Sequence, residues 1–287
     1  MDKWVILGES VIGNSHIQAE KPCQDSCSIE RIHDNWYLAI VSDGAGSCRF
    51  SHVGSKFLVE NGVEIFKRMF FDNEWEKAFP GKEEWNGKSI AGLGMISDRL
   101  VQFAEMNNYE IKDLSATIII VLFSRDGLML THVGDGRAAY LNKKHNWMPV
   151  LNPFQGEEAG STVFLTPDVL ARQELIKSRV VNKEIKGVAV LSDGSENTCW
   201  ITTEEKNGKI AESNKPFQPF FHQNAATIKS LSTKISEDEL NHAWKEYLVS
   251  GNQGFAKESD DKTMILAILN NSECEINETK GSEILDC

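Results

Sequence analysis

The sequence predicts one domain of mixed β-strands and α-helices in which several strands end at acidic side chains. Three apolar runs each finish in an aspartate followed by glycine, and a fourth begins just after Asp260 and Asp261. Two longer stretches have apolar residues at the spacing of helices that lie on a sheet. Carboxylates on neighbouring strands repel one another unless a hard divalent cation lies among them. The pattern therefore indicates a metal site built on a sheet, and a metal site indicates hydrolysis.

The expected strands are short apolar runs bounded by polar or glycine-rich segments. They lie at 4–8, 36–41, 115–123, 128–133, 138–141, 188–191 and 264–269. The run at 115–123 is continuous and rich in β-branched residues, which predicts a strand covered on both faces. Helices are expected at 53–70 and 90–106, and from a capping box at Ser236 to about Val249.

The remaining segments are expected to connect these elements. Residues 13–28 are expected to be a loop, and the Trp-rich segment 72–88 a surface connection. Residues 142–180 have weak periodicity with several Gly and Pro residues, so they are a candidate flap over the site. No clear linker divides the chain. We therefore expect one domain over 1–270, followed by a polar tail over 271–287.

The composition restricts the compartment and the partners. The 287 residues carry a formal net charge of -12, which disfavours nucleic acid or an anionic membrane surface as a partner. No apolar run is long enough to span a membrane, and the N-terminal apolar run is too short for a signal peptide. The six cysteines include no Cys-x-x-Cys pair, which is typical of reduced thiols in a cytoplasmic protein.

A single Asp-Gly pair after a strand is usually only a turn, and the pair at Asp126 is interpreted in this way. The other pairs share a more specific context. Asp43 and Asp193 each follow small apolar residues and a serine, and Asp135 has glycine on both sides, which lets the backbone approach an ion. Mg²⁺ and Mn²⁺ prefer oxygen ligands, and two such ions can activate a water and hold a phosphoryl group. No persuasive cluster of histidines indicates zinc.

Six motifs occur in an order that resembles the metal-dependent serine/threonine protein phosphatases of the type 2C class, most of all its compact bacterial branch. The motifs are Cys-Gln-Asp25-Ser, Val-Ser-Asp43-Gly-Ala-Gly-Ser, Ser115-Ala-Thr, His-Val-Gly-Asp135-Gly-Arg, Leu-Ser-Asp193-Gly and Asp260-Asp-Lys-Thr. The resemblance extends over roughly residues 5–269. It implies an α+β fold, a four-layer αββα sandwich of two packed antiparallel sheets flanked by helices, and dependence on Mn²⁺ or Mg²⁺.

The resemblance also implies a role for each acidic position. Asp43 would bridge two metal ions, and the carbonyl oxygen of Gly44 would ligate one of them. Asp193 and Asp260 would complete the shell of the other ion. Asp135, together with Asp193, would lie where the family can bind a third, looser ion.

The residues expected to contact the phosphate depart from the family pattern. Asp25 matches it, and the resemblance implies that this carboxyl holds metal-bound water. Many members carry arginine about five positions before that aspartate, where this chain has Glu20. Lys21 and Arg49 are therefore two alternative phosphate-binding cations.

The general acid is a second departure. Many eukaryotic members have histidine where this chain has Ala45. His16 is the stronger candidate and His52 the weaker, and a metal-bound water is a third alternative. Asp261 stands where asparagine is common, which adds a charge beside the ions.

Together these observations predict a cytoplasmic phosphomonoesterase that uses two or three Mn²⁺ or Mg²⁺ ions. It would remove phosphate from phosphoserine and phosphothreonine in proteins through attack by a metal-bridging hydroxide, without a phosphoenzyme. Its partners would be phosphoproteins, opposite a serine/threonine kinase, and we expect a monomer. Two alternatives remain open: a phosphatase-like binding module with little or no activity, and a phosphatase of a small-molecule phosphate.

Overall fold

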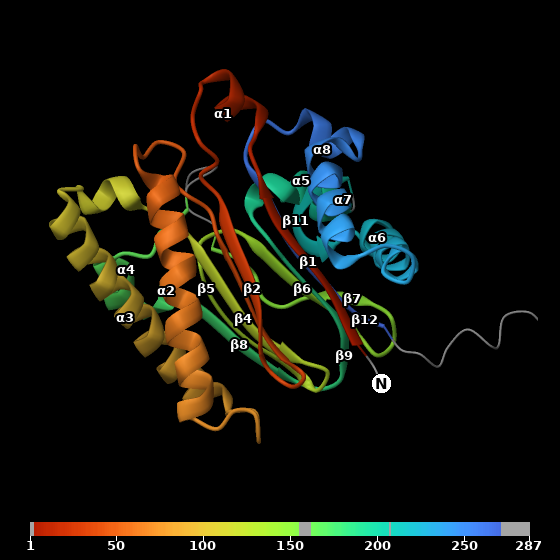
Figure 1. Cartoon of the computed structure of the whole chain (residues 1–287), viewed down its shortest axis with the longest axis horizontal. Helices are drawn as coiled ribbons and strands as arrows, with labels where there is room; N and C mark the ends of the chain where they lie inside the picture. Colours follow the sequence, from red (N-terminus) through yellow and green to blue (C-terminus); the bar gives the residue numbers. More distant parts are fainter. Residues whose placement is uncertain (1–2, 155–161, 207, 271–287) are drawn as a thin grey trace, which may run out of the picture.

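Two antiparallel sheets pack face to face, and helices cover the outer face of each (Figure 1). The structure is a computed structural model that describes residues 3–154, 162–206 and 208–270. The two sheets have five strands each. The predicted α+β fold, a four-layer αββα sandwich, is thus confirmed.

The strand order brings the two ends of the described chain together in the first sheet. This sheet runs β1 (Lys3–Val11), β12 (Lys262–Asn270), β9 (Ile185–Leu191), β6 (Arg137–Asn142) and β7 (Trp147–Pro149). The second sheet runs β2 (Ser26–His33), β3 (Trp36–Ser42), β4 (Ile118–Ser124), β5 (Gly127–Val133) and β8 (Lys177–Asn182). Strands β1 and β12 pair along their whole length, from Lys3 opposite Asn270 to Val11 opposite Lys262.

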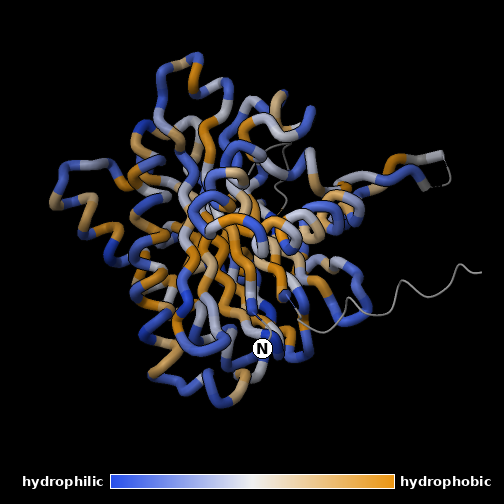
Figure 2. The backbone as a smooth tube through the Cα atoms, turned by 45° about the vertical axis from the view of Figure 1, so that its right-hand side comes forward, coloured by the Kyte–Doolittle hydropathy of each residue, from blue (hydrophilic) through white to orange (hydrophobic). Residues whose placement is uncertain are grey.

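Two long helices and two shorter ones form the outer layers. Helices α2 (Ser51–Asp72) and α3 (Lys82–Asn107) lie on the second sheet, and α6 (Gln218–Leu231) and α7 (Glu237–Ser250) lie on the first (Figure 1). The short helices are α1 (Asn14–Gln18), α4 (Pro167–Ala171), α5 (Glu196–Cys199) and α8 (Gln253–Lys257). A separate hairpin of β10 (Trp200–Lys206) and β11 (Lys209–Pro216) extends away from the sandwich (Figure 2).

Three apolar layers hold the sandwich together. One lies between the sheets, one under α2 and α3, and one under α6 and α7. The apolar segments accordingly gather in the middle of the molecule (Figure 2). All seven residues of β4 are buried, which confirms the predicted strand covered on both faces.

The capping box that begins α7 is also confirmed. The Ser236 side chain accepts a hydrogen bond from the Glu239 amide, and the Glu239 carboxylate accepts one from the Ser236 amide. These bonds satisfy donors that the first turn of a helix leaves unpaired.

Two expectations about connecting segments were wrong. The predicted loop over 13–28 contains α1 and the start of β2. The predicted surface connection over 72–88 contains two buried tryptophans, and α3 begins within it. Trp75 is 1% exposed, and Trp85 is fully buried and donates its indole N–H to the Leu130 carbonyl at 2.7 Å. Indole rings buried under polar neighbours explain the error, because a polar segment can still contribute large apolar groups to the core.

The domain boundaries and the flap stay predictions. Within 142–180, β7 and the first part of β8 belong to the two sheets, while residues 155–161 lie outside the described residues. The predicted tail over 271–287 also lies outside them. Among the described residues, no helix is long and apolar enough to cross a membrane.

Candidate metal centre

Acidic side chains from both sheets meet at one end of the sandwich. Asp43 follows β3 and Asp135 follows β5 in the second sheet, while Asp193 follows β9 and Asp260 precedes β12 in the first. Asp25 lies just before β2. We call this group of five the carboxylate rim.

The pairing of β9 with β12 fixes two members of the rim next to each other. Leu191 lies opposite Met264, so the residues after β9 continue beside those before β12. The backbone approach is very close, because a Cβ atom on Gly194 would lie 2.0 Å from the Asp261 carbonyl oxygen. Only glycine fits this position, and the Asp193 turn is therefore pressed against the Asp260 segment.

The carboxyl groups of the rim raise one another's pKa values. Burial raises the pKa of Asp43 well above its usual value, and the charges of Asp25, Asp193 and Asp260 raise it further. Burial raises the pKa of Asp135 to about 6, with a further contribution from Asp193. Burial raises the pKa of Asp260, and the charges of Asp193 and the adjacent Asp261 raise it further, whereas a backbone hydrogen bond and His16 lower it. Five segments distant in sequence thus share one electrostatic site.

The turn at Asp43 is held by the Ser115-Ala-Thr motif. Thr117 donates its backbone N–H to the Asp43 carbonyl at 2.8 Å, and its hydroxyl accepts the Asp43 N–H at 3.0 Å. Gly44 forms an isolated β-bridge with Ala116. A Cβ atom on Gly44 would lie 2.7 Å from the Gln24 carbonyl oxygen, so this turn also requires glycine.

Asp25 is held by two hydroxyls from the opposite sheet. Ser192 and Thr263 each donate to its Oδ2 at 2.7 Å. Burial raises the pKa of Asp25 to about 7, although these two hydrogen bonds oppose the shift. The motifs around Asp25, Asp193 and Asp260 are therefore joined directly by hydrogen bonds.

The donor chemistry of the rim fits Mn²⁺ or Mg²⁺. Within the described part of the chain, Asp25 Oδ1 and Asp193 Oδ1 are buried without a hydrogen-bond partner, and oxygen atoms of this kind are the ligands that these ions prefer. As the side chains stand, no three His, Cys, Asp or Glu residues among those described have the spacing to enclose one ion. The metal ligands Asp43, Gly44, Asp135, Asp193 and Asp260 therefore stay predictions.

Of the two candidate phosphate-binding cations, Lys21 has a contact beside the rim. It is exposed, and its Nζ lies 3.5 Å from the carbonyl oxygen of Gly46 in the turn after Asp43. Arg49 is also exposed, and its guanidinium lies over the Phe50 ring, 5.0 Å from the centroid. Both roles stay predictions.

His16 lies beside the rim on α1. Its side chain is buried, and Nδ1 lies 2.9 Å from Asp261 Oδ1, without full hydrogen-bond alignment. The imidazole also contributes to lowering the pKa of Asp260. His52 is on the first turn of α2, and its Nδ1 is buried without a partner among the described residues.

Sequence reasoning left the effect of Asp261 open and missed the hydroxyls that hold Asp25. The Asp261 side chain contacts the backbone of Gly13 and Gln24, more than 200 residues away in sequence. Ser192 and Thr263 each stand in one of the six motifs, Leu-Ser-Asp193-Gly and Asp260-Asp-Lys-Thr, and that placement was the available signal.

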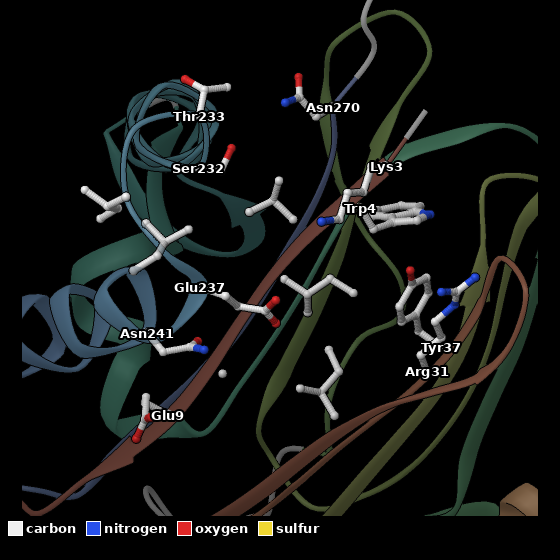
Figure 3. A pocket seen from close by; sticks show the side chains of 16 residues that line it. Lys3, Trp4, Glu9, Arg31, Tyr37, Ser232, Thr233, Glu237, Asn241 and Asn270 are labelled. Carbon is white, nitrogen blue, oxygen red and sulfur yellow. The ribbon is translucent and has the colours of Figure 1, made fainter. Parts of the chain in front are cut away.

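The structure also contains a groove of about 670 Å³ (Figure 3). It is bounded by β1, the segment from α6 to α7, and the hairpin of β2 and β3, and the side chains labelled in the figure include Trp4, Arg31, Tyr37 and Glu237. No member of the carboxylate rim lines this groove. The carboxylates, rather than the groove, therefore define the candidate site.

Comparison with known protein families shows to which family the chain belongs. The family model for protein phosphatase 2C matches residues 12–244. This chain belongs to the protein phosphatase 2C family. Membership in this family confirms the resemblance seen in the motifs. Together with the relative described below, it also confirms the enzyme class, a serine/threonine protein phosphatase.

Relatives of this phosphatase 2C chain cover nearly its whole length. Serine/threonine-protein phosphatase 3 of Escherichia coli (strain K12) is 27% identical over 275 residues, 92% of this chain and 98% of the relative. A solved bacterial serine phosphatase is 15% identical, with a TM-score of 0.57 over 95% of this chain and 100% of that one. Stp1 from Staphylococcus aureus is also 15% identical, with a TM-score of 0.54 over 94% and 96% of the two chains. At these identities the solved structures show that the fold is shared.

Proposed function

We propose that this chain is a Mn²⁺- or Mg²⁺-dependent phosphomonoesterase that hydrolyses phosphoserine and phosphothreonine in proteins. The observation that carries the proposal is the effect of Asp25, Asp193 and Asp260 on Asp43, because four carboxyls from separate segments favour cations among them. Family membership and the protein substrate in the name of the Escherichia coli relative support the substrate class.

The rim would hold the ions through oxygen atoms alone. Asp43 would bridge two ions and the Gly44 carbonyl would ligate one, while Asp193 and Asp260 would ligate the other. Asp135 with Asp193 would hold a third ion. When bound, such ions supply a water that ionises near neutral pH, and positive charge at the phosphoryl oxygens.

Asp25 would orient the attacking water. Its Oδ2 is occupied by two hydroxyls, whereas Oδ1 is buried without a partner among the described residues. The hydroxyls fix the carboxyl group, so the second oxygen is available at a fixed position to accept a hydrogen bond. A fixed acceptor of this kind holds a nucleophile in the orientation needed for attack.

Lys21 or Arg49 would bind the substrate phosphate, and His16 would donate a proton to the leaving alkoxide. Lys21 lies over the turn after Asp43, which favours it over Arg49. His16 is buried beside Asp261, and a carboxylate next to an imidazole orients the ring for proton transfer.

Hydrolysis would proceed in one step without a covalent phosphoenzyme. Burial raises the pKa values of the Cys23 and Cys27 thiols, so neither is poised to ionise as a nucleophile. We also expect the protein to act in the cytoplasm as a monomer that opposes a serine/threonine kinase.

The test is release of p-nitrophenol from its phosphate ester, and of phosphate from phosphopeptides, with Mn²⁺ and with Mg²⁺. The wild-type chain should be active and Asp43→Asn should fall to the background rate. Faster turnover of metabolite phosphates than of phosphopeptides would show that the substrates are small molecules and not phosphoproteins. A wild-type protein that is inactive with both ions would reject the proposal in favour of a binding module.

A further inference from the structure

The Asp261 carboxyl is next to a predicted ligand in sequence, but its side chain is bonded to a different segment. It is only 2% exposed. Its Oδ1 accepts the Gly13 N–H at 2.7 Å, and its Oδ2 accepts the Gln24 N–H at 2.5 Å. His16 Nδ1 lies 2.9 Å from Oδ1. Both carboxylate oxygens are therefore engaged by the segment that connects β1 to β2.

This connecting segment carries several predicted site residues. His16 lies within it, Lys21 follows α1, and Asp25 directly follows the bonded Gln24. The carbonyl of Gln24 accepts the Gly44 N–H at 3.2 Å. One backbone residue thus links the Asp261 side chain to the turn that carries the predicted carbonyl ligand.

The backbone around Asp261 leaves little freedom for this arrangement to shift. A Cβ atom on Gly13 would lie 2.2 Å from the carbonyl carbon of Asp260. Ser15 donates its N–H and its hydroxyl to the Ser259 carbonyl at 2.9 and 2.6 Å. The start of the connecting segment is thus packed against 259–261. Its far end is tied to Asp261 through the Gln24 N–H, and Ser192 and Thr263 hold the next residue, Asp25.

We propose that Asp261 is a positioning residue whose carboxylate ties both ends of segment 13–24 to the Asp260 turn. It thereby holds Asp25, His16 and the Gly44 carbonyl at the carboxylate rim. Its two oxygens accept the backbone N–H groups of Gly13 and Gln24, and the carboxylate does not itself bind an ion. The contacts stand on their own, and only the kinetic part of the proposal rests on the proposed function.

The chemistry of the donors separates two substitutions at this position. Asparagine can accept only one of the two backbone N–H groups, because its NH₂ is a donor that would face the other. Alanine accepts neither and leaves two buried donors unpaired. Asp261→Ala should therefore have the larger effect and Asp261→Asn a smaller effect of the same kind.

The direct test is amide hydrogen exchange followed by mass spectrometry, which needs no activity. In Asp261→Ala, exchange of 13–25 should accelerate by about 10-fold or more, while β2 keeps its wild-type rate. Asp261→Asn should be intermediate. The matched control is Leu93→Ala. It truncates a fully buried side chain of α3, in the apolar layer under α2 and α3. It should lower Tm without accelerating exchange of 13–25.

Kinetics and metal binding separate positioning from general destabilisation and from ligation. At saturating Mn²⁺ and well below Tm, kcat of Asp261→Asn should fall about 10-fold with a smaller change in KM. Leu93→Ala should keep the wild-type kcat under these conditions. The number of Mn²⁺ ions bound, counted by electron paramagnetic resonance, should be the same in Asp261→Asn and the wild type.

Two results would overturn the proposal. One is wild-type exchange of 13–25 in Asp261→Ala, or in Asp261→Asn should the alanine variant not fold. The other is loss of a bound Mn²⁺ in Asp261→Asn, which would make Asp261 a ligand. An inactive wild-type protein would defeat the proposed function, while hydrogen exchange would still decide the role of Asp261.

Discussion

Asp-Gly pairs at opposite ends of the second sheet have different roles. At one end, Asp126 and Gly127 complete the turn between β4 and β5, with Ser124 paired to Gly127. Asp126 is exposed, and its N–H donates to the nearby Ser124 hydroxyl. At the other end, Asp43 and Asp135 are partly buried among further carboxyls. An Asp-Gly dipeptide alone therefore does not indicate a site. A site is indicated where carboxyls from several strand ends lie close together.

Asp126 lies too far from the rim to take part in the same site. Strands β4 and β5 each contain seven residues, a length of about 23 Å at the rise of an antiparallel strand. Asp126 therefore lies a full strand length from the rim and cannot share an ion with it. This predicted turn is confirmed by the pairing of β4 with β5.

The largest expected effect is on activity. Asp193→Asn should remove nearly all manganese-dependent phosphatase activity, because it replaces a carboxylate whose Oδ1 is buried without a partner among the described residues. Asp126→Asn should retain wild-type activity. Steady-state hydrolysis of a phosphopeptide measures both. Equal losses in the two variants would break the comparison between the two ends.

Stabilisation of the protein by bound metal should depend on the rim and not on the turn at Asp126. Mn²⁺ at about 100 times its Kd should stabilise the protein by about 2.7 kcal/mol, because only the folded chain brings the carboxyls together. The rise in Tm, measured by differential scanning fluorimetry, should persist in Asp126→Asn and disappear in Asp43→Asn. A full rise in Asp43→Asn would place the binding site elsewhere.

The tight turn after Asp43 can be probed by adding one methyl group. Gly44→Ala would place Cβ 2.7 and 2.8 Å from the backbone oxygens of Gln24 and Ser51, so it should cost about 1–3 kcal/mol in the free energy of unfolding. Gly46→Ala is the matched control two residues later, where the nearest atom is a side-chain oxygen at 4.0 Å. It should stay within about 0.5 kcal/mol of the wild type. Urea unfolding with EDTA present measures both, and similar costs would contradict the close approach at Gly44.

The stability of the metal-free protein should also depend on pH. The pKa values of Asp25 and Asp135 rise from 3.8 to about 7 and about 6 on folding, so the folded chain binds more protons between these limits. Stability in EDTA should thus fall as the pH rises from 4 to 7, by at most about 1.4 kcal/mol per pH unit for each carboxyl. Urea unfolding at several pH values measures this slope. Asp135→Asn should reduce it between pH 4 and 6, whereas an unchanged slope would contradict the shift at Asp135.

The sequence was sufficient to predict the strands beside Asp43, Asp135, Asp193 and Asp260, because each apolar run ends or begins close to its aspartate, but it did not predict β2, which follows Asp25. The buried β4 and the cap of α7 were predicted from residue type and spacing alone. The resemblance of six motifs supplied the four-layer arrangement. These features depend on short stretches of sequence, which is why they could be predicted.

Contacts between distant segments could not be predicted from the sequence. Nothing in the sequence pairs Asp25 with Ser192 and Thr263, since those partners are 167 and 238 residues away. Nor does it direct the Asp261 side chain toward Gly13. Such contacts are set by the order of strands in the sheets, which local periodicity does not encode.

The pairing of β1 with β12 has a consequence for synthesis of the chain. Asp25 is made early, whereas Asp260 and β12 are among the last described residues to be made. Until β12 is added, β9 lacks the neighbour that brings Asp193 beside Asp260. A chain that ends at α7 lacks Asp260 and the strand on which α6 and α7 pack, so its site is incomplete until β12 is inserted between β1 and β9.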